Sequence, residues 1–426
     1  MSKAQRAGEW IKTLLIVLLT VSALLLGWRT MLFNDILSSI PFFGSVAELM
    51  RGSSGTVETG GSPIKEAARP LCIVITNEDG ARFGVRYDTE ARNAVYDRIS
   101  SIMGEALGSA TAPSEISEDE WRSALAGLGV YFEYVTPVKL SVLDGWLGAR
   151  MPETAVDALL RRVVVAIGDE RSRIYYQDYN SGLYYGADTA SAAGKAQELE
   201  IYSPNDAVFA YESGVPGASI APYMLLTQER YHPEVRAAAA GSSDELLDLT
   251  LAAMGHGNET YTTYPEGDSV RRVGTQFRIG VDQRGQVLYR NTEGLTPGDE
   301  IYSWGESDLI EQARLIVADT IGSVCGGAEV FFESLEYGTG DSVSVLFAYY
   351  IAGGGIYLFE DLYAAKVTIT SGVVTEIELN FRNYSFTGEF TRLLPETQAL
   401  AAAGGEFMLC YSDTGAERLT PSWVVR

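Results

Sequence analysis

The sequence contains little histidine and little cysteine, and this excludes two common kinds of site. Its 426 residues include two histidines, His232 and His256, which are too far apart for the ligand spacing of a common zinc site. Its three cysteines, Cys72, Cys325 and Cys410, are too few and too widely spaced for a disulfide framework. Each lies in or beside an apolar stretch, so we predict three buried thiols that act as small hydrophobic side chains. No metal and no cofactor is expected.

The sequence also lacks runs of positive charge. It has 32 Lys and Arg against 56 Asp and Glu, which gives a formal net charge of −24. A surface of this charge repels anionic polymers, and nucleic-acid binding depends on neutralising phosphates. No nucleic-acid partner is therefore expected. The remaining composition, 46% hydrophobic and 21% charged, is typical of a globular protein.

Signatures of catalysis are missing as well. There is no G-x-S-x-G nucleophile elbow, and the one S-x-x-K, Ser62 to Lys65, lies in a Gly/Pro-rich linker where no helix would aim the lysine. Gly353–Gly355 is not followed by the Lys-Ser/Thr of a phosphate-binding loop, so a tight turn is predicted there. The acidic groups Glu118–Glu120 and Glu360–Asp361 are interpreted as a helix N-terminus and a solvated loop. We predict that the protein is not an enzyme.

Two further polar motifs are interpreted as structural. Asn77–Gly80 lacks the alternating ligands and the distal glutamate of an EF-hand, and a hairpin turn explains it without calcium. His256 follows the predicted end of a helix, and no serine or cysteine at a recognisable elbow accompanies it.

One long apolar run is present, near the start of the chain. Thr13–Trp28 carries no charge, and a helix from Trp10 to Trp28 would rise about 27 Å, close to the roughly 30 Å of a bilayer's hydrocarbon core. Lys3, Arg6 and Lys12 precede it, which places the N-terminus in the cytoplasm and the bulk of the chain outside.

The apolar run is predicted to be an uncleaved, single-pass anchor in the cell membrane. A cleaved signal needs small residues just after the apolar run, whereas here the bulky and charged sequence GWRTMLFND follows. The candidate residues for membrane anchoring and partner contact are Trp10, Leu14, Leu15, Leu18, Leu19, Ser22, Ala23, Leu26 and Trp28.

The predicted fold class is α+β: a single transmembrane helix, then about three extracytoplasmic modules of antiparallel sheet with helices on one face. The predicted segments are a cytoplasmic tail 1–12, the anchor 13–33, a juxtamembrane segment and Gly/Ser linker 34–69, and α+β domains at 70–205, 206–305 and 306–426.

The last two domains look alike. Ser242 and Ser307 are each predicted to cap a helix, and four strands follow each helix, near 259–289 and 329–380. A duplication would explain this pattern, and so would two independent antiparallel meanders. Before them, Pro204–Gly241 is predicted to be a connection with room for a short helix, and it includes the alanine run Ala237–Ala240.

Several blocks, together with this layout, resemble clostridial YycH-like members of the YycH/YycI family of Gram-positive bacteria. The resemblance covers most of residues 10–426, although residues 150–300 match only in pattern. The family's C-terminal module ends in L-x-P-x-W, as Leu419–Val425 does. The blocks are Leu71–Tyr87 with the helix through Gly104–Ala110, Trp121–Tyr134, Leu140–Gly148, Leu393–Ala403 and Leu419–Val425.

This resemblance implies an accessory regulator of the WalK (YycG) sensor histidine kinase, in a two-component system that controls cell-wall metabolism. It implies a YycI-like C-terminal domain and no enzyme activity, cofactor or metal. The implied partners are the kinase, whose membrane helices would contact the anchor, and a second YycH/YycI-type protein. It assigns no role to individual residues and leaves open whether the kinase is activated or inhibited.

Two other functions fit the same sequence. The outer region could be a binding module for an extracellular peptide or wall polymer, with the anchor as a plain tether. A less favoured alternative is an anchored cell-wall hydrolase, which would need a cleft with convergent acids or a nucleophile beside a base.

Overall fold

The computed structural model describes residues 65–150, 157–168, 170–190, 192–267, 269–292 and 305–425. The predicted anchor, 13–33, lies outside these residues, as do the N-terminal tail and nearly all of the linker. Within the described ranges no helix is both long enough and apolar enough to cross a membrane. The described chain combines several sheets, antiparallel except for one parallel pair of strands, with helices, and this confirms the predicted α+β class.

The first sheet has seven strands in the order β2-β1-β4-β5-β6-β7-β3, and every neighbouring pair is antiparallel. Its first hairpin turns at Asn77–Gly80, as predicted, because Gly80 adopts a positive φ of 77°. The strands are β1 Cys72–Thr76, β2 Arg82–Val85, β3 Ser114–Ile116, β4 Gly129–Lys139, β5 Leu159–Ala166, β6 Ser172–Asp178 and β7 Tyr184–Thr189.

Helices cover this sheet on both faces, and not on one face as predicted. The side chain of Asp88 accepts a hydrogen bond from Ala91 N and caps α3 (Thr89–Gly108), and Ser117 caps α4 (Glu118–Ala126) in the same way. On one face α4 packs with the short strands β8 (Val208–Phe209) and β9 (Leu225–Leu226). Helix α3 contacts β1, β5 and β6, but none of its residues belongs to the apolar cluster that α4, β8 and β9 form with the sheet. It therefore covers the other face.

The second sheet has eleven strands, with the path β11-β12-β13-β14-β19-β18-β16-β17-β21-β23 and β15 paired to β16. It therefore contains strands from both the predicted middle and C-terminal domains, and they join where β14 pairs with β19. The strands are β11 Thr262–Glu266, β12 Ser269–Val273, β13 Phe277–Val281, β14 Gln286–Asn291, β15 Glu329–Tyr337, β16 Ser342–Ile351, β17 Gly354–Leu358, β18 Ala365–Thr370, β19 Val373–Asn380, β21 Phe407–Asp413 and β23 Pro421–Val425.

The remaining helices lie beside these strands. α5 (Leu140–Leu147) follows β4, α7 (Ser243–Ala253) contacts β13, and α8 (Glu306–Val317) contacts β15, β16 and β18. Single turns and short helices complete the chain: η1 Lys65–Ala68, η2 Ala193–Lys195, α6 Ala196–Leu199, η3 Ala210–Glu212, η4 Ala318–Gly322, η5 Phe359–Asp361 and α9 Glu396–Ala403.

The predicted helix followed by four strands occurs as α7 with β11–β14. In the second unit five strands, β15–β19, follow α8, because β17 pairs with β16 between the predicted strands. Ser242 forms a reciprocal capping box with Glu245, as predicted. The prediction that Ser307 caps α8 is wrong. The helix begins earlier, after Gly305, because the Asp308 carboxylate accepts a hydrogen bond from Gly305 N.

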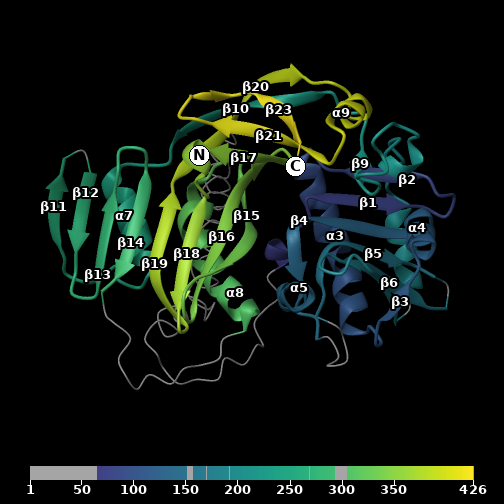
Figure 1. Ribbon diagram of the computed structural model, residues 1–426, viewed down its shortest axis with the longest axis horizontal. Helices are drawn as coiled ribbons and strands as arrows, with labels where there is room; N and C mark the ends of the chain where they lie inside the picture. The colour runs from purple at the N-terminus through teal and green to yellow at the C-terminus, as the bar shows by residue number, and fades with distance from the viewer. Residues whose placement is uncertain are drawn as a thin grey trace, which may run out of the picture. The chain divides into compact units, whose positions relative to one another are not determined.

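The prediction for Pro204–Gly241 is also wrong in part. The alanine run belongs to a strand, β10 (Tyr231–Ala239), which pairs with β20 (Arg382–Arg392) and β22 (Arg418–Leu419) in a three-stranded sheet (Figure 1). Pairing on both sides outweighs the helix propensity of alanine. The small side chain of Ala237 is buried on this strand.

The turn between β16 and β17 gives a first testable prediction. Gly353 has a φ of +67°, and a Cβ built there would lie 2.5 Å from the carbonyl oxygen of Arg86. Gly353→Ala is therefore expected to lower the free energy of unfolding by more than the roughly 1–2 kcal/mol of left-handed backbone strain alone. Thermal unfolding of the two proteins measures the loss.

Gly340 provides the matched control for this substitution. It occupies the turn between β15 and β16 with a φ of +68°, and a Cβ there would meet no atom within 4 Å. Gly340→Ala should therefore lose only the strain contribution. Equal losses in the two variants would contradict the close approach of Gly353 to Arg86.

Candidate functional site

The residues predicted from the sequence as the functional site, from Trp10 to Trp28, all lie outside the described residues. The structure therefore does not place the predicted partner-contact surface. Of the S-x-x-K motif only Lys65 is described, in η1.

The polar motifs in the described chain have the structural roles that were predicted. Glu118–Glu120 forms the first turn of α4. Gly353 lies in the hairpin turn between β16 and β17, and Gly354 is the first residue of β17. Glu360 is exposed in η5. The three cysteines are buried and form no disulfide with one another, and burial raises the thiol pKa of Cys72 and of Cys325. No group of three metal-ligating side chains occurs among the described residues.

His256 is held by two hydrogen bonds. Its Nδ1 lies 2.9 Å from a carboxylate oxygen of Glu259, and its Nε2 lies 2.9 Å from the hydroxyl of Tyr289. Its ring also packs against Phe277, with the centroids 4.7 Å apart. These contacts tie the end of α7 to β13 and β14, which agrees with the structural role predicted for this histidine.

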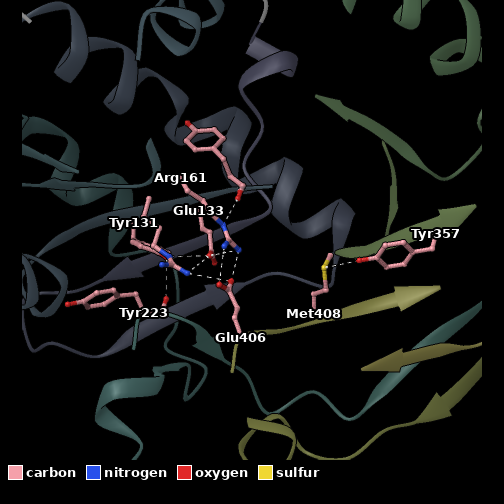
Figure 2. A network of polar contacts seen from close by, with 9 residues as sticks. Tyr131, Glu133, Arg161, Tyr223, Tyr357, Glu406 and Met408 are labelled. Carbon is pink, nitrogen blue, oxygen red and sulfur yellow. Dashed lines mark hydrogen bonds and ion pairs between the residues drawn. The ribbon is translucent and has the colours of Figure 1, made fainter. Parts of the chain in front are cut away.

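A network of buried charges lies between the first sheet and the loop that precedes β21. There Glu133 of β4, Arg161 and Arg162 of β5, and Glu406 form one network of ion pairs (Figure 2). Arg161 donates two parallel hydrogen bonds to Glu406, at 2.6 and 3.1 Å. Arg162 donates twice to Oε1 of Glu133, at 3.2 and 3.1 Å.

A β-bulge explains how two adjacent arginines reach the same site. Neighbouring residues of a regular strand point to opposite faces of the sheet. In β5 the pairing with β6 shifts between Leu160 and Val163, so that Arg161 and Arg162 together lie opposite Gln177. Bulges of this kind redirect side chains. Both guanidinium groups therefore approach the carboxylates of Glu133 and Glu406.

The network is electrically balanced. Burial disfavours the charged form of Glu406, but Arg161 and Arg162 outweigh this and lower its pKa to about 2. The carboxylate of Glu133 is 1% exposed, so both arginines depend on it for local neutrality. A hollow of about 410 Å³ opens beside the network and is lined by Pro137, Arg161, Arg162, Gln177, Tyr179 and Glu406. Since its charges are already paired within the protein, this hollow lacks a free charge for a ligand.

A second buried polar group connects β2 to the C-terminal part of the chain. Tyr87 donates a hydrogen bond to Glu396 at 2.5 Å, and both the backbone N–H and the hydroxyl of Thr227 donate to the other carboxylate oxygen. Burial raises the pKa of Glu396, while these donors and the charge of Arg86 oppose the rise. The ring of His232 stands edge-on to Tyr87, 4.8 Å away.

Further pairs join the first sheet and its helices to the second sheet. On α3, Arg92 is fully buried and forms an ion pair with Glu329 of β15, 2.5 Å away. Thr136 of β4 donates to the carbonyl of Glu333, at a bulge in β15. Lys139 lies 2.8 Å from Glu306 at the start of α8. Together with the two buried groups, these contacts fasten the two sheets to each other, and none of them forms a catalytic arrangement.

Sequence reasoning missed this junction, although it left a signal. Glu133 interrupts the apolar run VYFEYV, and Arg161 and Arg162 interrupt LLRRVVV. A charge inside a buried strand requires a partner. Glu406 gave no such signal, because it lies in a glycine-rich loop and meets the arginines only after folding.

Comparison with known proteins identifies the fold. No family model matches the sequence, and no curated protein matches it either. Among solved structures, YycH from Bacillus subtilis matches with a TM-score of 0.51 at 13% identity, over 87% of this chain and 96% of that chain. The chain therefore has a YycH-like fold, which confirms the predicted resemblance at the level of structure. An uncharacterized protein from Eubacterium rectale gives a TM-score of 0.31 at 10% identity, over 46% of this chain and 76% of that one.

Proposed function

We propose that this protein is a non-enzymatic, membrane-anchored accessory regulator of a WalK (YycG)-type sensor histidine kinase that controls cell-wall metabolism. The observation that carries the proposal is the likeness in fold to YycH, which extends over 87% of this chain. The polar groups at the junction of the two sheets support a non-catalytic role, because their charges pair with one another.

In this proposal the protein biases the kinase between its signalling states by binding one state better than the other. The anchor, 13–33, would contact the membrane helices of the kinase, and the outer domains would modulate that association. Buried ion pairs such as Arg92–Glu329 and Arg161–Glu406 join the two sheets of the outer region. The outer region would therefore act on a partner as one body.

Co-purification from membranes tests the partner. The intact, affinity-tagged chain is extracted in mild detergent, and its bound proteins are identified by mass spectrometry. We expect a sensor histidine kinase to be retained, and retained less by a chain whose residues 13–28 are replaced with an unrelated membrane helix. Repeated absence of any histidine kinase would refute the proposal.

The same helix replacement separates a working anchor from a plain tether. If the anchor contacts the kinase, the replacement should abolish control of cell-wall gene expression while the protein stays in the membrane. Expression of those genes and the amount of protein in the membrane fraction are the two measurements. Control that survives the replacement would favour the alternative of a tethered extracellular binding module.

A further inference from the structure

Strand β20 ends in a stretch whose outer edge is open. It is the outermost strand of the three-stranded sheet β20-β10-β22, of which β20 and β10 are labelled in Figure 1. Near the start of β20 the outer edge is occupied: the N–H of Tyr384 donates to the carbonyl of Cys325, and the N–H of Gly327 donates to the carbonyl of Tyr384. From Phe386 to Arg392 no strand of the described chain pairs with this edge.

The backbone of this stretch is oriented to accept another strand. Leu393 N donates to the carbonyl of Arg230, so the opposed residues Arg392 and Tyr231 form a pair that is not hydrogen-bonded to each other. The N–H and C=O groups of Arg392 therefore point away from β10. Hydrogen-bonded and non-hydrogen-bonded pairs alternate along an antiparallel ladder, so the N–H and C=O groups of Phe390 also point away from β10. The open edge presents the backbone groups of every second residue.

Large apolar side chains accompany this edge. Tyr231, Phe390 and Phe386 are 62%, 61% and 51% exposed, and Leu394, just beyond the strand, is 56% exposed. At roughly 200 Å² for each aromatic side chain, the three rings together expose about 350 Å². Exposed patches of this size mark interaction sites more often than scattered surface residues do.

The exposed side chains of the strands share one face of the β10–β20 ribbon. Residues opposed across an antiparallel pair point to the same face, and Phe390 and Phe386 oppose Pro233 and Val235. On that face Val235 is buried, and so is Tyr384, whose ring packs against Tyr349 of β16. The face is thus covered at one end of the ribbon and uncovered at the other.

The charges around the uncovered end indicate the chemistry of its occupant. Arg230 and Arg392 are exposed and form no ion pair with another described residue, whereas Arg418 on the adjoining strand pairs with Glu234 and Glu389. Arg392 lies opposite Tyr231 in the pairing of β20 with β10, and Arg230 precedes Tyr231 in the chain. Aromatic residues and arginine are enriched at protein interfaces.

We propose that the outer edge of β20, from Phe386 to Arg392, is a docking site for an extended acidic segment of a partner protein, which joins the sheet as an additional strand. The open backbone groups favour a polypeptide over a lipid surface, because lipid cannot form a ladder of hydrogen bonds. The free arginines favour an acidic segment over a second copy of this chain, which would bring the same arginines and a further net charge of −24. The proposal stands independently of the kinase assignment.

Protection of the edge against aggregation is the alternative explanation for part of this geometry. A bulge at Gly388, with a φ of +82°, and the charge of Glu389 are devices that blunt exposed edges. They interrupt pairing only at residues 387–389, however. Protection against aggregation does not explain why Phe386 and Phe390, on either side of the bulge, are exposed.

Peptide binding to the full-length protein in detergent tests the site directly. The probe is a labelled eight-residue peptide of alternating Glu and Val, compared with one of alternating Lys and Val. We expect saturable binding of the acidic peptide, at least tenfold weaker binding of the basic one, and loss of binding when alternate backbone nitrogens of the acidic peptide are methylated. Equal binding of the two peptides, or no binding of the acidic one, would overturn the proposal.

Variants then locate the binding. Phe390→Ser should weaken the binding of the acidic peptide at least fivefold. The double variant Arg230→Glu/Arg392→Glu should bind the basic peptide more tightly than the acidic one. The matched control is Tyr264→Ser, which removes an exposed tyrosine from β11, the edge strand at the far end of the second sheet. All these side chains are exposed, so the folded state should persist, and thermal unfolding checks this. Binding that is unchanged in the Phe390 and arginine variants would overturn the proposal.

Photo-crosslinking in membranes identifies the occupant. A photoreactive phenylalanine analogue at position 390, with position 264 as the control site, is activated in cells, and the adduct is sequenced by mass spectrometry. We expect an acidic segment of another protein to be attached at 390 and not at 264. Attachment to a second copy of this chain or to lipid, or no adduct at 390, would overturn the proposal.

Discussion

Replacing Glu133 by alanine is expected to lower the free energy of unfolding by about 3–5 kcal/mol. The substitution leaves the guanidinium groups of Arg161 and Arg162 inside the junction with one shared carboxylate, that of Glu406, in place of two. Removing one partner of a buried ion pair is costly because the remaining charge stays away from water. Equilibrium unfolding in urea, followed by circular dichroism, measures the change.

Glu376→Ala is the matched control for this prediction. Glu376 pairs with Arg290 across β19 and β14, but the two side chains are 33% and 58% exposed. Exposed ion pairs contribute less than about 1 kcal/mol, so this variant should unfold almost as the parent does. If the two variants lose the same stability, the network around Glu133 does not behave as a buried one.

The parts of the fold that follow from neighbouring residues could be predicted from the sequence. The hairpin at Asn77–Gly80, the helix N-terminus at Glu118–Glu120 and the cap at Ser242 all appear where the local pattern placed them. Each depends on the preferences of one turn and on hydrogen bonds within a few residues. Such signals persist whatever the rest of the chain does.

Structure that depends on distant pairing could not be predicted. The sequence predicts a connection at Ala237, because Pro204–Gly241 mixes several prolines and glycines with a run of alanines. It lies in a strand because Tyr384 opposes it from β20, and such a pairing leaves no local signal. The parallel pairing of β17 with β21, which brings Gly355 beside Cys410, was missed for the same reason.

The candidate site divides in the same way. Glu133, Arg161 and Arg162 stand out as charges within apolar strands, so a buried network could be inferred from the sequence, but its partner Glu406 could not. The open edge of β20 was also hidden. Phe386 and Phe390 look like core residues of an alternating strand, and only the pairing order shows that their end of the ribbon is uncovered.

Acid is expected to destabilise the folded protein through His232. Its ring is fully buried between Tyr87 and Trp423, and neither ring nitrogen has a hydrogen-bond partner among the described residues. Burial lowers the pKa of His232 from 6.5 to about 4, and the charge of Arg86 acts in the same direction. The unfolded chain therefore binds this proton more readily than the folded chain does between pH 4 and pH 6.5.

The size and sign of the effect follow from this difference. The contribution of His232 is fully present above pH 6.5, is lost progressively as the pH falls towards 4, and changes no further below that; the total loss is about 3 kcal/mol. The raised pKa of Glu396, which contacts Tyr87, gives the opposite trend, so the difference between two proteins is the quantity to measure.

His232→Phe isolates the histidine. Phenylalanine keeps an aromatic ring between Tyr87 and Trp423 and removes two buried nitrogens that lack partners, so the variant should fold and be more stable than the parent at pH 7. The difference in free energy of unfolding between this variant and the parent should grow by about 3 kcal/mol as the pH falls from 7 to 4. His256→Phe, which removes two hydrogen bonds, should instead be less stable than the parent at pH 7. Urea unfolding at several pH values measures both, and an advantage of His232→Phe that does not change with pH would contradict the buried, neutral state of this ring.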